Sequence, residues 1–229
     1  MTKLRERMFD DGARGFRRIA QPPELRPNPV TELGPRNAQS RDPARADHTD
    51  ALARYNEDRF ALEVLEAITA GPRTARLTKS LVFDQQAAAS VGTSQDSSEN
   101  AGEFEITVTP RPGHSLTELE QATDAIFEQL KKDGPTTEEI QRATAGLELN
   151  FVTGLQSNLG KAMRLANGAG FHGNAGQFQT DYAKTLSVTA ADVKRVANKY
   201  LTRGRVVLSI VPMGKTDQAS KPAESKPVQ

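Results

Sequence analysis

Cysteine and tryptophan are both missing from this sequence of 229 residues, and histidine occurs only 3 times. Without cysteine there can be no disulfide bond, no thiolate metal site and no cysteine nucleophile. The lack of disulfides fits a reducing compartment as well as an oxidising one. Any chemistry of the chain is therefore left to oxygen and nitrogen side chains.

Long apolar runs and an excess of one charge are also lacking. No apolar stretch approaches the ~20 residues that a transmembrane helix needs. The start, Met1–Phe16, has no apolar core of the kind that marks a signal peptide. The 30 basic and 29 acidic residues leave a net charge of +1, which gives no electrostatic reason to expect nucleic acid as a partner. We therefore expect no membrane span and no nucleic-acid binding.

Apolar residues make up 36% of the chain and are unevenly distributed. Residues 1–50 hold six of the 13 prolines, and residues 215–229 are rich in Lys, Ser, Pro and Gln. Neither end has enough apolar surface to offset the entropy of ordering. We predict a Pro- and Arg-rich linker or disordered segment at 1–54, a folded domain at 55–213 and a disordered tail at 214–229.

The first half of that domain is predicted to form two helices and then a hairpin. Asn56 is a suitable N-cap for the first helix, which ends at Gly71-Pro72. Its apolar face recurs at helical spacing and consists of Phe60, Val64, Leu65 and Ile68. A second helix covers 74–83, with Leu77 and Leu81 inward. Residues 87–94 and 103–109 form an antiparallel hairpin, because "EFEITVT" (Glu103–Thr109) alternates between polar and apolar residues.

Three capping boxes mark helix starts in the second half. They are "SLTE" (Ser115–Glu118), "TTEE" (Thr136–Glu139) and "TAAD" (Thr189–Asp192). Further helices are predicted at 159–171 and 176–186, and a final strand, "RVVLSIV", at 205–211. This order predicts an α+β fold, with an antiparallel sheet and helices packed on one face.

No group of residues in the sequence makes a self-contained active site. His48, His114 and His172 lack a second histidine at the i, i+4 spacing of a zinc-binding helix. The glycine-rich stretch Gly168–Gly176 lacks the order of a phosphate-binding loop and is better explained as a junction between helices. Glu138-Glu139 stand in a first helical turn, where the helix dipole favours them. We predict no catalytic, substrate-binding or metal-binding residue in this chain.

Three motifs occur in a characteristic order. They are "R-L-x-x-x-L-V" (Arg76–Val82), "G-x-T-x-E-E-I-x-R-A" (Gly134–Ala143) and "V-T-A-A-D-V-x-x-V-A-x-K-Y-L" (Val188–Leu201). Together they resemble the C-terminal, non-zinc domain of the pitrilysin/insulinase family of zinc metallopeptidases, over about residues 58–212. The resemblance implies the α+β domain of that family, in which two or four such domains close around an unfolded peptide.

The chain also departs from that family. The zinc motif, H-x-x-E-H, is absent from the sequence, so the resemblance implies zinc only on a partner domain or subunit and no cofactor here. In active members, the joint between the second helix and the hairpin carries an Arg and, seven residues on, a Tyr that assist the transition state. The matching positions are Val82 and Ala89, and neither side chain can donate a hydrogen bond. The family's first edge strand falls at 36–55, which is polar here, so we expect it to be missing or degenerate.

We therefore expect a catalytically inactive domain, not an enzyme by itself, that forms one wall of a peptide-binding chamber. The expected partner is a zinc-bearing N-terminal-type domain or subunit, and unfolded peptide is the expected ligand. Two alternatives stay open, a structural or scaffolding module and a truncated remnant with no peptidase role. We interpret the chain as a truncated product or a piece of a longer parent, and as periplasmic if that parent is an exported bacterial protein.

Overall fold

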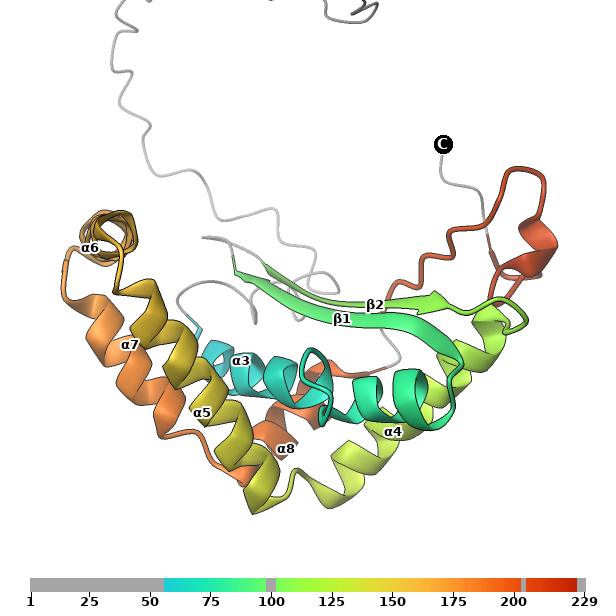
Figure 1. Cartoon of the computed structure of the whole chain (residues 1–229), viewed down its shortest axis with the longest axis horizontal. Coiled ribbons are helices and arrows are strands. Elements are labelled where there is room, and N and C mark those ends of the chain that lie inside the picture. The colour runs from blue at the N-terminus through green and yellow to red at the C-terminus, as the bar shows by residue number, and fades with distance from the viewer. Residues whose placement is uncertain (1–55, 98–101, 203–204, 226–229) are drawn as a thin grey trace, which may run out of the picture. The chain divides into compact units, whose positions relative to one another are not determined.

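The computed structural model describes residues 56–97, 102–202 and 205–225. The predicted linker at 1–54 and the degenerate edge strand at 36–55 lie outside the described residues. Figure 1 shows the described part as a hairpin of two strands lying against a layer of helices.

Helix α3, Asp58–Thr69, is buried along most of its length. The predicted N-cap at Asn56 is wrong by one residue, because the N-cap is Glu57, whose side chain makes no capping hydrogen bond. Oδ1 of Asn56 still accepts a hydrogen bond from the backbone nitrogen of Asp58 (2.8 Å). The predicted apolar face is confirmed, since Phe60, Val64, Leu65 and Ile68 are all buried. After the helix, Gly71 takes a φ of 99°, a left-handed backbone conformation that favours glycine.

Strands β1, Ala88–Ser97, and β2, Gly102–Pro110, form the predicted antiparallel hairpin. Phe104, Ile106 and Val108 of β2 pack against the core, whereas the residues between them are exposed. The alternation read from the sequence is therefore confirmed. The hairpin lies along α3, to which the Thr93 hydroxyl donates a hydrogen bond at the carbonyl oxygen of Glu66 (3.2 Å).

The second predicted helix is present, but its main turns are of the π type. After a short helical start, η2 spans Thr78–Asp84. The backbone nitrogen of Gln85 donates to the carbonyl oxygen of Ser80 (2.8 Å), which is the i→i+5 bond that defines a π turn. Leu77 and Leu81 are fully buried, as predicted.

Helices α4 (Leu116–Asp133), α5 (Thr137–Gly154) and α8 (Ala190–Tyr200) begin at the three predicted capping boxes. Ser115, Thr136 and Thr189 each accept a hydrogen bond from the backbone nitrogen three residues on. The backbone nitrogens of Thr136 and Thr189 also donate the reciprocal bond to the carboxylates of Glu139 and Asp192, whereas the predicted box at Ser115 lacks this second bond. Each box satisfies backbone donors that the first helical turn would otherwise leave unpaired.

Helices α6 (Asn158–His172) and α7 (Gln177–Leu186) confirm the last two predicted helices. The glycine-rich stretch between them is a helix junction, as expected. Gly173 ends α6 in the left-handed conformation, with a φ of 65°. Gly168 packs closely on the turn that follows, since a Cβ there would lie 2.5 Å from the carbonyl oxygen of Asn174. A larger side chain at Gly168 therefore cannot be accommodated without a backbone shift.

The core lies between the hairpin and the helices on one of its faces, so the predicted α+β fold is confirmed. It is built mainly by α3, η2, α4 and α8. Its fully buried larger side chains are Leu62, Leu65, Leu77, Leu81, Leu130, Val64, Val193 and Val196. No helix among the described residues is both long and apolar enough to span a membrane.

The predicted strand at 205–211 is wrong for this structure. The segment pairs with neither strand of the described sheet, and Val206 and Ile210 are 95% and 85% exposed. Its anchors lie elsewhere, because Arg205 binds Asp124 and Glu120 of α4. An apolar run forms a strand only where the edge of a sheet is available to pair with it. Whether such an edge is available depends on residues that are distant in the sequence.

The part of the predicted tail that the structure describes also contacts α4. It contains the short helix η3, Thr216–Gln218, followed by the buried Ser220. The hydroxyl of Thr117 donates to the carbonyl oxygen of Ser220 (2.7 Å), and Lys221 pairs with Glu120 (3.0 Å). These polar contacts order a segment that its apolar content alone would not.

Candidate functional site

The joint between η2 and β1 is the position at which the resemblance locates catalytic support in active relatives. A single side chain, that of Arg111, bonds to the backbone on both sides of this joint. The guanidinium of Arg111 donates to the carbonyl oxygens of Ala88 (Nε, 3.1 Å) and Val82 (Nη2, 3.3 Å). Between these anchors Gln86 has a φ of 54°, a strained value for a residue other than glycine. The joint is thus fixed in one conformation by long-range hydrogen bonds.

The two side chains of interest point to different surroundings within this joint. Val82 is half-buried and packs against the core. Ala89 is exposed and stands at a β-bulge, where the register shifts between Ala88 and Ser90. Neither side chain can move a proton or stabilise an oxyanion. That these positions match the Arg and Tyr of active relatives stays a prediction.

The histidines do not form a site within the described residues. His114 precedes α4 and bonds to Glu118 through Nδ1 (3.0 Å), whereas His172 is the last residue of α6. His48 lies outside the described residues. The part of the chain that the structure describes contains no group of three or more His, Asp or Glu side chains that could hold a metal ion. The donor set for the family's zinc is therefore not found there.

The glutamates at helix starts have structural partners, as predicted. Glu139 accepts two hydrogen bonds from the guanidinium of Arg76 (2.7 and 2.8 Å) and one from the backbone nitrogen of Thr136 (2.8 Å). The Arg76 bonds, with the Thr136 bonds, lower the pKa of Glu139. This ionised carboxylate links the residues before η2 to α5, and its lowered pKa does not suit a general acid.

A groove of about 420 Å³ lies among α3, α5, α7 and the end of β1, and no pattern in the sequence predicts it. Its walls carry Arg59, Glu63 and Glu66 from α3, and Phe151 and Tyr182 from α5 and α7. The Phe151 and Tyr182 rings stack at 3.9 Å between centroids. Two acids one turn apart on the polar side of a helix resemble solvated surface residues, so only the tertiary packing reveals the groove.

Burial is the main influence on the pKa values of the two glutamates in this groove. It raises the pKa of Glu63, against the hydrogen bond from the Thr185 hydroxyl (2.9 Å) and the nearby positive charge of Arg59. Burial also raises the pKa of Glu66, against a hydrogen bond from the backbone of Gln95, and the neighbouring charge of Glu63 adds to the rise. The groove therefore holds carboxylates whose charge is poorly compensated.

Comparison with known proteins gives a family match for part of the chain. Residues 49–147 match the family model described as the peptidase M16 inactive domain. An uncharacterized zinc protease of Streptomyces coelicolor is 29% identical over 170 residues. That match covers 74% of this chain but only 37% of the relative, so the chain spans little more than a third of its length.

Solved structures share the fold. The inactive peptidase domain of a proposed zinc protease from Bordetella parapertussis superposes with a TM-score of 0.59 at 21% identity, over 70% of this chain and 87% of that one. A protease from Helicobacter pylori gives a TM-score of 0.61 at 21% identity, over 66% of this chain and 36% of that one. The family model, the relative and the shared fold agree with the motifs in the sequence. Residues 49–147 therefore match the inactive domain of the M16 peptidases, which agrees with the resemblance to the pitrilysin/insulinase family.

Proposed function

We propose that this chain is a non-catalytic domain that forms one wall of a peptide-binding chamber, together with a zinc-bearing domain or subunit that is not in the chain. The match to the inactive domain supports the lack of catalysis. The absence of H-x-x-E-H from the sequence and the aliphatic side chains at Val82 and Ala89 agree with it.

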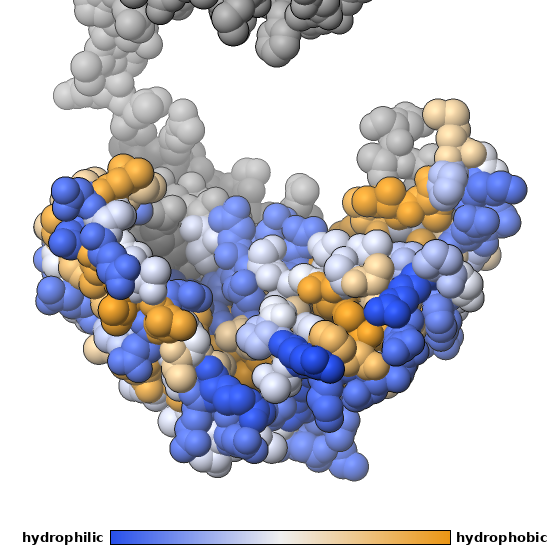
Figure 2. Space-filling view, in the orientation of Figure 1, coloured by the Kyte–Doolittle hydropathy of each residue, from blue (hydrophilic) through white to orange (hydrophobic). Residues whose placement is uncertain are grey.

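The observation that supports pairing with a zinc-bearing domain or subunit is a group of exposed apolar side chains on the segment after α8. Val206, Val207, Leu208 and Ile210 of this segment are 95%, 46%, 67% and 85% exposed. Figure 2 shows hydrophobic residues gathered over this segment at the upper right, and again over α6 at the upper left. Apolar surface of this extent is typical of an interaction site.

The test is a zinc and peptidase assay on the full chain, with and without a zinc-bearing M16 relative from the same organism. We expect zinc and cleavage of a quenched, unstructured peptide to depend on the mixture, and the two proteins to co-elute. Ile210→Asp should weaken co-elution, whereas Gln129→Asp, on an exposed position of α4, should not. Cleavage by the chain alone would overturn the proposal.

A scaffold without a peptidase role is the second candidate, and the loss of hydrogen-bond donors at Val82 and Ala89 favours it. Peptide affinity separates the two functions. A chamber wall should increase the affinity of the mixture for peptide over that of the zinc-bearing partner alone. A scaffold should pair with the partner and leave that affinity unchanged.

A further inference from the structure

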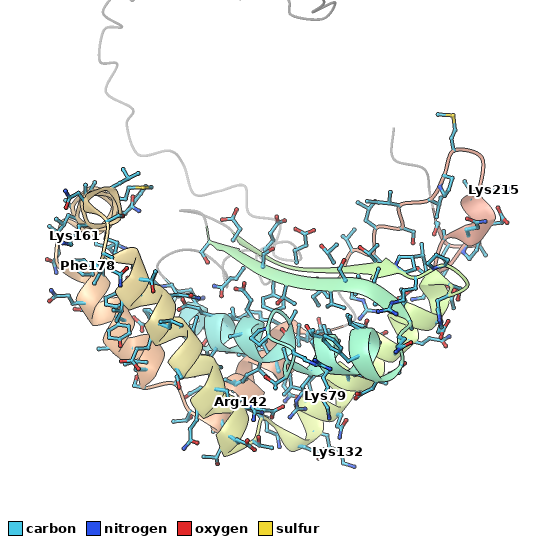
Figure 3. The ribbon with its side chains drawn as sticks, viewed as in Figure 1. Lys79, Lys132, Arg142, Lys161, Phe178 and Lys215 are labelled. Carbon is cyan, nitrogen blue, oxygen red and sulfur yellow. The ribbon has the colours of Figure 1, made fainter. Side chains whose placement is uncertain are left out.

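The groove among α3, α5, α7 and β1 is large enough to hold a side chain of a ligand. Its volume of about 420 Å³ falls within the range of small-ligand pockets. Phe178, which Figure 3 labels near the start of α7, lines it together with Phe60 and Phe151. Aromatic side chains thus form much of its apolar wall.

The charged groups that line the groove do not balance. They are Arg59, Glu63, Glu66, Arg164 and Asp181. Arg59 is paired with Asp181 (2.7 Å). The guanidinium of Arg164 lies over the Phe151 ring, 4.8 Å from its centre. Within the described residues, no ion pair reaches Glu63 or Glu66, so two carboxylates one helical turn apart face the groove without a bonded cation.

The groove also offers acceptors in excess of donors. The carboxylate of Glu63 accepts one bond from Thr185 and lies near the charges of Arg59 and Arg164, and the carboxylate of Glu66 accepts one bond from the backbone of Gln95. Each carboxylate therefore has lone pairs left for further donors. A positively charged ligand rich in donors would bond the two carboxylates, whereas an acidic ligand would be repelled and a purely apolar one would bury the charges further.

We propose that this groove binds a primary ammonium or guanidinium on an aliphatic stem, as carried by a lysine or arginine side chain of a peptide. The cation lies at Glu63 and Glu66, and the methylene groups of the stem lie along Phe178. Contact of such stems with aromatic rings is favourable, and the ring faces add attraction for the cation. That the cation belongs to a peptide rests on the proposed function.

The test measures fluorescence anisotropy of labelled, unstructured peptides with the full chain. Three peptides differ at one position, which is Arg, Gln or Glu. We expect the Arg peptide to bind about tenfold more tightly than the Gln peptide, because one hydrogen bond to a charged group contributes about that factor in affinity. The Glu peptide should bind most weakly. Equal affinities for the Arg and Gln peptides would overturn the inference.

Variants assign the effect to the groove. The double variant Glu63→Gln/Glu66→Gln keeps the shape of both side chains and should reduce Arg-peptide affinity to that of the Gln peptide. Glu138→Gln, a carboxylate on α5 that is 76% exposed, should change nothing. A circular dichroism melt checks that the double variant folds. An unchanged affinity in a folded double variant would refute the assignment.

Two further arms separate the source of the cation and the two proposals. If spermidine displaces the Arg peptide at concentrations below those of unlabelled Arg peptide, the ligand is a free polyamine and the peptide assignment fails. Arg-selective binding by the chain alone, with no partner-dependent cleavage, would keep this inference and defeat the chamber function. Partner-dependent cleavage with equal affinity for the Arg and Gln peptides would do the reverse.

Discussion

Helices α3 and α6 have similar lengths and similar apolar content, but they serve different ends. Eight of the 12 residues of α3 are buried, whereas Gly168 is the only buried residue among the 15 of α6. The apolar side chains Leu159 and Met163 of α6 are 70% and 57% exposed. An apolar stripe therefore does not by itself identify core, because α3 is enclosed by other elements and α6 packs mainly against α7.

The comparison can be tested most strongly by removing a leucine from each helix. Leu65→Ala should lower the free energy of unfolding by about 3 kcal/mol, because Leu65 is fully buried and its loss leaves a cavity. Leu159→Ala should change it by less than about 0.5 kcal/mol, as exposed substitutions do. Urea titration followed by far-UV circular dichroism measures both. Equal losses would mean that α6 is covered in the folded chain.

The second effect concerns the charge at the start of α3. Asp58 binds Arg195 (2.6 Å), Lys199 (3.0 Å) and Tyr200 (2.6 Å), all on α8. Asp58→Asn should cost about 2 kcal/mol, less than a fully buried pair would, because Arg195 and Lys199 are about half exposed. Glu57→Gln, which breaks an exposed pair with Lys184, should cost under about 0.5 kcal/mol. The same urea titrations decide the point.

The contacts of Asp58 also predict that the free energy of unfolding falls at acid pH. Burial raises the pKa of Asp58, but hydrogen bonds from Tyr200, Arg195 and Lys199 outweigh it and lower the pKa to about 2. In the unfolded chain the pKa of an aspartate is about 4. The stabilisation is therefore complete above about pH 5 and is lost as pH falls through 4 toward 2. Unfolding free energies between pH 6 and 3 should converge for the wild type and Asp58→Asn, and a constant difference would contradict the assignment.

The smallest expected effects come from alanine substitutions at two glycines of α6. Gly168→Ala should destabilise by about 1.5 kcal/mol, because the new methyl group would lie against the backbone of Asn174 and Ala175. Gly170→Ala, two residues away, meets open space and should stabilise by up to about 1 kcal/mol through helix propensity. Thermal melts of the two variants should shift in opposite directions. Shifts of the same sign would show that the packing of Gly168 is not what holds the α6–α7 junction.

The local part of this fold could be predicted from the sequence. Capping at Ser115, Thr136 and Thr189 depends on residues three positions apart, and the alternation of Phe104, Ile106 and Val108 depends on neighbours. Such patterns fix an element with little help from the rest of the chain. The inactive domain was recognised for the same reason, because its motifs lie within continuous stretches.

What could not be predicted depends on packing between distant segments. The stretch at 205–211 has the composition of a strand, but polar contacts of Arg205 with α4 direct it away from β2. The π turns of η2 and the exposure of α6 also follow from tertiary context. Glu63 and Glu66 resemble ordinary surface acids until α5 and α7 close around them.

The β-bulge at Ala89 has a consequence for how this sequence can change over time. A tyrosine replaced by alanine inside a core leaves a void that costs several kcal/mol, and selection for folding acts against it. Ala89 is exposed and outside the regular strand pairing, so exchange of a ring and a methyl group there leaves no void. Folding stability therefore neither favours nor opposes an aromatic ring at residue 89. The presence or absence of that ring is therefore free to follow function alone.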